Sequence, residues 1–190
     1  METTTKPLQV AVADRNRYNA RRTGGDKYRD QVIALVAQKG YQVSDSTYHQ
    51  DMHEASDLLL DGQGCALRIR SEKALQRWPD EFTIRAVRPG YGACSRQACS
   101  RQACSRQPDT EFQKIMDGHA RYALYGFTDG HDRIVLLRLL DLDVFRDSIK
   151  GDWKKYDRDM RIGADGVGYL VFNIREFPKA LVACVWDYRH

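Results

Sequence analysis

Hydrophobic and polar positions follow two periods along this chain, one helical and one of alternating residues, and together they predict an ordered set of elements. Residues 26–40 carry apolar side chains at helical spacing. Asp26 is placed to cap the N-terminus of this helix, and Gly40 provides a C-terminal stop. Residues 41–48 alternate weakly between polar and apolar side chains and predict a short strand.

The clearest signal follows at residues 57–70, which predict a β-hairpin. A short apolar run leads into a glycine-rich turn, and a strictly alternating strand follows the turn. The alternation directs Leu67 and Ile69 toward the core. It leaves Arg68 and Arg70 together on the opposite face.

The rest of the chain shows the same alternating and helical patterns. The remaining segments predict a strand at 82–88, a helix at 110–116, strands at 121–127 and 133–142, and strands at 170–172 and 181–186 that close the sheet. Asp109 or Thr110 caps the second helix, and Gly118 ends it. Residues 146–165 are highly charged and predict a solvated helix or loop. The predicted fold class is therefore α/β, with a central mixed β-sheet flanked by helices.

The predicted organisation is a polar, basic tail over residues 1–24 followed by a single domain over 25–190. Residues 93–107 interrupt the domain with three exact copies of Ala-Cys-Ser-Arg-Gln, which indicate a loop expanded by duplication. Cysteines five positions apart point in different directions on a helix and to alternate faces on a strand. The repeat therefore predicts a basic loop able to touch a phosphate backbone rather than a metal cluster.

Composition excludes several classes of protein. A chain of 190 residues can bury the core of one domain, and no apolar run approaches the roughly 18 residues that span a bilayer. The N-terminus has no signal-peptide core, and an odd number of cysteines, five, does not fit a secreted disulfide framework. We therefore expect a cytoplasmic protein without a membrane partner. No Walker loop, dinucleotide glycine pattern or Gly-x-Ser-x-Gly elbow is present.

Charge is concentrated in one stretch although the net charge is only +4. Residues 65–107 hold nine basic side chains against three acidic ones. Such a stretch predicts a surface that binds a polyanion, while the alternative is solvated arginines that keep strand edges from associating. Trp78 beside Arg77 is a candidate for stacking on a base.

The order of elements over residues 26–127, with Asp57 at the start of the hairpin, resembles the PD-(D/E)XK nucleases. In that family a helix precedes a β-hairpin, whose first strand brings an Asp and whose second brings Glu or Asp, any residue, then Lys. The carboxylates hold Mg²⁺ and the lysine positions the attacking water. The resemblance implies a restriction-endonuclease-like core and a metal-dependent nucleic-acid phosphodiesterase of phage or mobile-element type. Its cofactor would be Mg²⁺ or Mn²⁺ and its partner nucleic acid, DNA in particular; a homodimer is left open.

One departure from the family pattern decides where the site is expected. Arginines at 68 and 70 occupy the Glu-x-Lys position, and a guanidinium cannot bind a metal. The resemblance then implies a relocated catalytic set, of which the three acids would hold the metal: Asp57, Glu81, Glu111 and Lys114. Lys114 follows Glu111 by one helical turn on the same face and would orient water.

Arginines on the predicted strands supply the nucleic-acid contacts that this hypothesis requires, and they are Arg68, Arg70, Arg85 and Arg88. Clustered arginines need acidic partners or phosphates, because unpaired charges held close together are unfavourable. The same arginines support an alternative function, a catalytically inactive nuclease-fold protein that binds nucleic acid or a protein partner.

Ordinary structural roles compete with the functional ones. Asp57 is also placed to close a turn, and the helix dipole favours an acid such as Glu111 in a first turn. A third hypothesis centres on His49 and His53, which would share a helix face at a spacing suited to a transition metal. That spacing suggests a small metal-dependent hydrolase, although the His-Glu-x-x-His pattern is absent.

Overall fold

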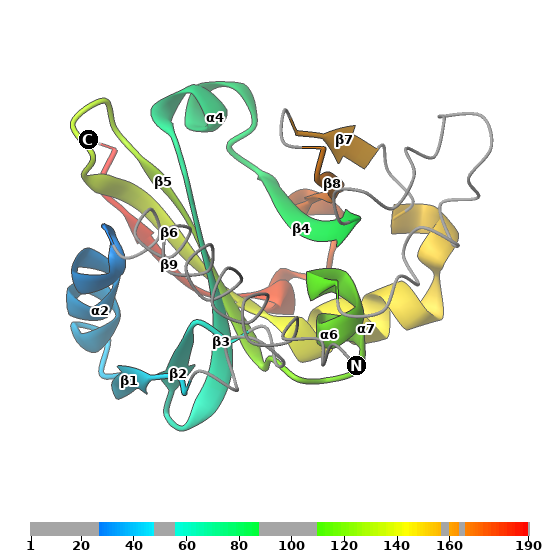
Figure 1. Ribbon diagram of the computed structural model, residues 1–190, viewed down its shortest axis with the longest axis horizontal. Helices are drawn as coiled ribbons and strands as arrows, with labels where there is room; N and C mark the ends of the chain where they lie inside the picture. Colours follow the sequence, from blue (N-terminus) through cyan, green and yellow to red (C-terminus); the bar gives the residue numbers. More distant parts are fainter. Residues whose placement is uncertain (1–26, 48–55, 88–109, 157–159, 164–165, 190) are drawn as a thin grey trace, which may run out of the picture.

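The computed structural model describes residues 27–47, 56–87, 110–156, 160–163 and 166–189. Within these residues the chain forms two β-sheets with helices packed on them (Figure 1). The N-terminal tail, the five-residue repeat, Arg88, and the pair His49 and His53 lie outside the described residues.

The larger sheet has six strands in the order β1-β2-β3-β5-β6-β9. Its strands are β1 (Val43–Asp45), β2 (Leu58–Leu60), β3 (Gln63–Arg70), β5 (Tyr122–Thr128), β6 (Ile134–Asp141) and β9 (Val182–Asp187). β3 and β5 run parallel, and every other neighbouring pair is antiparallel. The prediction of a central mixed sheet is therefore confirmed, and so is the hairpin, in which Leu58 is paired with Cys65.

The smaller sheet corrects one prediction. It contains β4 (Glu81–Val87), β8 (Gly168–Asn173) and β7 (Met160–Ile162), with β8 in the middle and both pairings antiparallel. The strand predicted at 170–172 therefore does not close the central sheet. It pairs with β4 instead, where Phe172 lies opposite Phe82 and the two rings stack at 5.3 Å between centroids.

Helices cover both faces of the larger sheet (Figure 1). α2 (Arg29–Ala37) packs on one face, and α6 (Glu111–Met116), α7 (Leu142–Gly151) and the smaller sheet pack on the other. A short helix, α4 (Glu72–Arg77), joins β3 to β4, and three 3-10 turns follow α7: η1 (Trp153–Tyr156), η2 (Ile174–Glu176) and η3 (Lys179–Leu181). In the described part of the chain, no helix combines the length and hydropathy of a membrane span.

Two hydrophobic clusters separate along these faces. On the α2 side, Val32 and Val36 pack among aliphatic side chains of the sheet and Trp186. On the other side, aromatic rings of the smaller sheet pack on α7, with the centroids of Phe145 and Phe172 5.0 Å apart. Alternate residues of β3 and β5 therefore point into different layers, which places the polar residues of β3 on the aromatic side.

The predictions for the helices hold for α2 and α6 but not for α7, which follows β6. α2 and α6 form where the sequence predicts them, and Gly40 follows α2 with a φ of 88°. The charged stretch predicted as a solvated helix or loop contains most of α7, which buries Phe145 and Ile149. Its helix begins earlier than expected because the Asp141 carboxylate accepts the N–H groups of residues 143 and 144.

Candidate functional site

Polar side chains from four separate elements, β3, β4, β5 and α6, meet between the two sheets. Arg68 on β3 donates to Glu111 Oε2 on α6. One position along the same face of β3, Arg70 Nη1 donates to Thr83 Oγ1 on β4 at 3.0 Å. Thr83 Oγ1 lies 3.3 Å from the hydroxyl oxygen of Tyr125 on β5. Two of the predicted arginines, Arg68 and Arg70, therefore bind α6 and β4, although β3 and β4 belong to different sheets.

Glu111 is the buried acid of this cluster, with 9% of its side chain exposed. It occupies the first turn of α6, whose N-terminus is capped by Thr110 Oγ1, an acceptor for the N–H of Gln113 at 3.2 Å. Glu111 Oε2 also accepts the backbone N–H of Arg85 at 3.3 Å. A buried carboxylate needs a compensating cation, and Arg68 supplies it. The charge of Glu111 raises the pKa of Arg68, while burial opposes the rise.

Asp57 lies at the edge of the hairpin, and its charge affects the same arginine. Its backbone N–H donates to the carbonyl of Cys65 at 2.9 Å, and its Oδ2 accepts the N–H of Leu67 at 2.6 Å. Asp57 therefore extends the β2–β3 pairing just before the start of β2, whereas the sequence suggested that it closes a turn. Its charge also raises the pKa of Arg68, less than that of Glu111 does. Two of the predicted carboxylates thus act on one guanidinium.

Glu81 does not join them. It begins β4, four residues before Arg85, and its Oε2 lies 2.7 Å from Arg161 Nη1. Arg161 also lies over the ring of Trp78, with its Cζ 4.3 Å from the ring centroid, so a cation already contacts the residue proposed for base stacking. The prediction of Glu81 as a third carboxylate at the Asp57–Glu111 site is not met by this arrangement.

Lys114 lies close to Glu111 because both residues belong to α6. It lies one turn further along α6 and is partly buried. Both residues belong to the set that the sequence predicts, and α6 holds them at adjacent positions on its surface.

The arginines outnumber the acids in this cluster. Arg70 and Arg85 have no carboxylate partner among the described residues, whereas Arg68 is paired. The Nε atoms of Arg68 and Arg85 are buried and make no hydrogen bond within the described part of the chain. Buried N–H donors of this kind are rare and call for an acceptor.

A small cavity lies on the inner side of the cluster. Arg68, Thr83, Glu111 and Tyr125 contribute its polar lining, and aliphatic and aromatic side chains complete it. Its volume of about 20 Å³ is enough for one water molecule and too small for a nucleotide. A larger ligand of the arginines must therefore approach from outside the cavity.

A divalent ion does not fit the cluster as it is arranged. Mg²⁺ and Mn²⁺ take carboxylate oxygens together with water or phosphate oxygens, but Glu111 Oε2 is already bound by the Arg68 guanidinium. No group of three or more His, Cys, Asp or Glu side chains suited to a metal ion occurs among the residues that the structure describes. Of the three acids predicted to hold Mg²⁺ or Mn²⁺, Glu111 is bound by Arg68, Asp57 accepts the N–H of Leu67, and Glu81 is paired with Arg161.

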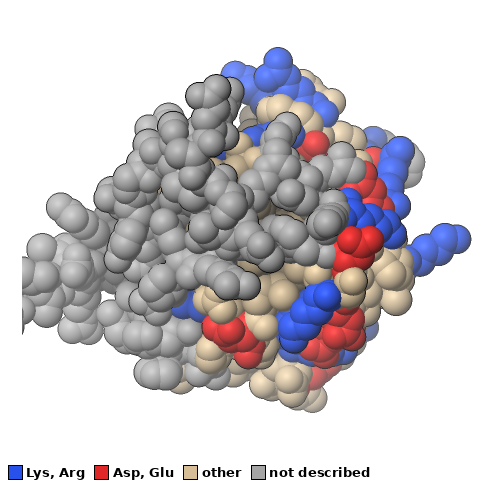
Figure 2. All heavy atoms as spheres, turned by 90° about the vertical axis from the view of Figure 1, so that its right-hand side faces the viewer, with Lys and Arg blue, Asp and Glu red and all other residues tan. Residues whose placement is uncertain are grey.

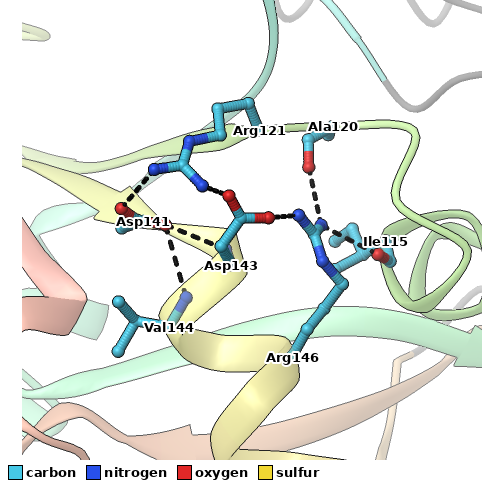
Figure 3. A network of polar contacts seen from close by, with 7 residues as sticks. All are labelled: Ile115, Ala120, Arg121, Asp141, Asp143, Val144 and Arg146. Atoms are coloured by element: carbon cyan, nitrogen blue, oxygen red, sulfur yellow. Dashed lines mark hydrogen bonds and ion pairs between the residues drawn. The ribbon is translucent and has the colours of Figure 1, made fainter.

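A second polar network holds α6 in place (Figure 3). Arg146 on α7 donates to the carbonyls of Ile115 and Ala120 at 3.1 and 2.9 Å, and to Asp143. Asp143 is in turn paired with Arg121, which also donates to Asp141 at 2.9 Å. The helix that carries Glu111 is therefore tied to α7 and to the end of β6.

The outer surface near these elements is mixed in charge. Figure 2 shows the face on the right of Figure 1, where basic and acidic side chains lie interspersed over the described atoms. On this part of that face the charge does not form a broad basic surface.

Sequence reasoning missed two members of the cluster as functional residues. These are Thr83 on β4 and Tyr125 on β5, both of which are buried, with 5% and 4% of the residue exposed. The available signal was the alternation of β5, which puts Tyr125 on the same face as its parallel neighbour Arg68. That signal becomes readable only once the pairing of β3 with β5 is known.

The sequence matches no protein family model, and no curated protein is similar enough to it to count as a relative. The function of the protein is therefore inferred from its residues and their geometry.

Proposed function

We propose that this protein binds nucleic acid, and that backbone phosphates are held by the arginine cluster of Arg68, Arg70 and Arg85. The observation that carries the proposal is Arg85, which is partly buried beside Glu111 and has no carboxylate partner in the described part of the chain. An arginine whose guanidinium has no acid among the described residues is suited to bind an anion that comes from outside.

The chemistry of the side chains favours phosphate over other anions. A guanidinium offers a planar fork of N–H groups that matches two oxygens of a phosphate. Arg70 is oriented by its hydrogen bond to Thr83, so less side-chain freedom is lost when it binds. The cluster has three arginines and two carboxylates, and an added phosphate would balance the remaining positive charge.

Fluorescence anisotropy with labelled single-stranded DNA, duplex DNA and RNA, each titrated over a range of salt, tests this proposal. Arg85→Gln should weaken binding at low salt and reduce the slope of log affinity against log salt by about 0.7 to 0.9, the value for one lost phosphate contact. Arg133→Gln is the matched control, because its side chain is 75% exposed and lies outside the cluster. Equal slopes for both variants and the unaltered protein would contradict the assignment of Arg85.

A second candidate is the Mg²⁺- or Mn²⁺-dependent phosphodiesterase, and one observation favours it. Asp57 and Glu111 come from distant parts of the chain and both are bound to β3, Asp57 by accepting the N–H of Leu67 and Glu111 by accepting a hydrogen bond from Arg68. Lys114 would then orient water near Glu111. Cleavage of single-stranded, duplex and branched DNA with Mn²⁺ tests it: activity must be lost in Asp57→Asn while DNA affinity is retained. Binding by the unaltered protein without any cleavage would leave the binding function alone.

A further inference from the structure

We propose that the outer face of the smaller sheet is a platform for single-stranded nucleic acid, on which Tyr169 of β8 stacks a base beside a phosphate held by Arg85. The platform depends on the proposed function for its phosphate contact, because Arg85 is the arginine that carries that function. It adds the class of nucleic acid and a residue that contacts a base instead of the backbone.

The register of the smaller sheet places Tyr169 beside Arg85. The two residues are directly opposite each other in the antiparallel pair of β4 and β8, so their side chains share a face. The backbone N–H of Arg85 points away from β8, since it donates to Glu111. The two residues therefore form a pair without mutual hydrogen bonds, in which the Cα atoms are only about 4.5 Å apart. A base stacked on Tyr169 would lie next to a guanidinium able to hold its phosphate.

The two faces of this sheet differ in the way that such a platform requires. Ile84 and Phe172 point into the aromatic core and are 3% and 1% exposed. Tyr169, Arg85 and Arg161 lie opposite one another on the other face, and all three are partly exposed. An antiparallel sheet commonly has one buried face and one that is accessible to solvent, and here the accessible face carries an aromatic ring between two arginines.

The ring of Tyr169 is available for stacking, whereas that of Trp78 is already covered. Arg161 lies over the Trp78 ring, with its Cζ 4.3 Å from the ring centroid. In the described part of the chain, no other aromatic ring stacks on Tyr169 and no lysine or arginine lies over it. A base can therefore meet this ring face to face, and such stacking tolerates any sequence because every base has a π-face.

The class of nucleic acid follows from the stacking. In a duplex the faces of the bases are stacked on one another, so only a single strand or an unpaired loop offers one to a side chain. Thr83 lies two residues before Arg85 on the same face of β4 and accepts a hydrogen bond from Arg70. The platform thus adjoins the arginine cluster, and a strand stacked on Tyr169 would continue along β4 toward Arg70.

Fluorescence anisotropy with two 12-nucleotide probes separates stacking from phosphate contact. The probes are oligothymidylate and an abasic strand with the same number of phosphates, and the unaltered protein should bind oligothymidylate more tightly. Tyr169→Ala should weaken oligothymidylate binding about 5- to 150-fold, the loss expected for one stacked base, and leave the affinity for the abasic strand unchanged. The slope of log affinity against log salt should also stay the same, because no phosphate contact is removed.

Three further variants identify the ring as the cause. Tyr169→Phe keeps the ring and should bind like the unaltered protein. Tyr169→Leu keeps an apolar side chain on β8 without a π-face and should lose most of the affinity that Tyr169→Ala loses. Tyr188→Ala is the control, because this residue is 48% exposed beside the edge strand β9 and lies outside the smaller sheet. It should leave binding of both probes unchanged, and circular dichroism melting confirms that each variant is folded.

Two results would overturn the platform. One is equal affinity of the unaltered protein for the two probes, and the other is a folded Tyr169→Ala protein that binds oligothymidylate as tightly as the unaltered protein. Tyr169→Ala should have no effect on a 12-base-pair duplex, and an equal loss there would assign Tyr169 to the backbone instead. The proposed phosphate contact fails separately, if Arg85→Gln leaves the salt slope unchanged while the effect of Tyr169→Ala persists. Absence of binding to every probe would overturn both proposals.

Discussion

Arg146 on α7 donates a hydrogen bond to the backbone carbonyl of Ile115 in the last turn of α6, with 3.1 Å between Nη1 and the oxygen (Figure 3). The same nitrogen donates to the carbonyl of Ala120 at 2.9 Å, just beyond the helix. The carbonyls at the end of a helix lack partners within it, and here a buried arginine provides them. Because Glu111 begins this short helix, the contact at its other end fixes the position of the candidate site.

Arg146→Met should therefore destabilise the protein strongly. The variant keeps an apolar stem but leaves two carbonyls without a donor, so we expect the free energy of unfolding to fall by about 3 kcal/mol. Urea unfolding followed by circular dichroism measures this. Arg133→Met removes an exposed arginine and should change stability by less than about 0.5 kcal/mol. Similar stabilities for the two variants would show that the Ile115 contact is not structurally important.

The N-terminal end of α6 offers a smaller test. Thr110 Oγ1 caps the helix by accepting the N–H of Gln113, and loss of such a cap usually costs about 1 kcal/mol. We expect urea unfolding to show that loss of unfolding free energy in Thr110→Ala. The amide hydrogens of α6 should also exchange with solvent faster in this variant than in the unaltered protein. Thr110→Ser retains the hydroxyl and should restore most of the stability. If alanine and serine behave alike, the cap contributes nothing.

Gly126 on β5 is required for close packing rather than for its backbone angles. A Cβ at this position would lie 2.8 Å from Ile69 Cδ1 and 2.9 Å from Leu137 Cδ1. Gly126→Ala should therefore destabilise the protein by about 1 to 3 kcal/mol through overpacking. At Gly151, the last residue of α7, nothing lies within 4 Å of the added atom. Gly151→Ala should be neutral or slightly stabilising. Thermal unfolding of the two variants tests this, and an equal loss of stability at both positions would contradict the packing explanation.

The sequence predicts individual elements well because periodicity is local. Alternation identifies β3 and β5, and helical spacing identifies α2 and α6, before any partner is known. The choice of sheet for residues 168–173 depends on contacts far along the chain. Phe172 stacks on Phe82 in a second layer, and nothing in the pattern of β8 distinguishes that layer from the central sheet.

The candidate site likewise combines residues that the local sequence predicts with contacts that depend on the tertiary fold. Asp57 and Glu111 were predictable as acids beside the hairpin and at a helix start, and both are bound to β3, at Leu67 and Arg68. Glu81 was chosen for its charge alone, but the register of β4 places it opposite Asn173 and beside Arg161. The partner of Arg68 was likewise out of reach of the sequence, because it depends on how α6 lies against β3.

Asp129 gives the loop between β5 and β6 a defined pH dependence. Its Oδ1 accepts the backbone N–H groups of Arg133 and His131 at 2.9 and 2.8 Å, and these bonds, the first above all, lower the pKa of the carboxyl. A group whose pKa is lower in the folded state stabilises the protein above its ordinary pKa and stops doing so as pH falls through the lowered value. Thermal unfolding of the unaltered protein and of Asp129→Asn should therefore differ by a constant amount at neutral pH. The difference should shrink only below about pH 3.8, the ordinary value for Asp. A gap that closes near pH 6 would assign the effect to another group.

The hydrogen bond between Arg70 and Thr83 joins the two sheets, and it should affect nucleic-acid binding through orientation rather than charge. Thr83→Val keeps the shape of the side chain and removes the hydroxyl that both Arg70 and Tyr125 contact. The guanidinium of Arg70 remains in the variant, but its orientation is no longer fixed before binding.

We therefore expect Thr83→Val to weaken oligonucleotide binding several-fold while the salt dependence stays the same, because the number of phosphate charges neutralised does not change. Arg70→Gln should instead reduce the slope of log affinity against log salt by about 0.7 to 0.9. Tyr125→Phe should act like Thr83→Val with a smaller effect, since Thr83 keeps its bond to Arg70. Anisotropy titrations of the three variants over one salt series separate these outcomes. A reduced slope in Thr83→Val would mean that the hydroxyl determines whether Arg70 reaches the phosphate at all, and the role assigned to it as an orienting group would be wrong.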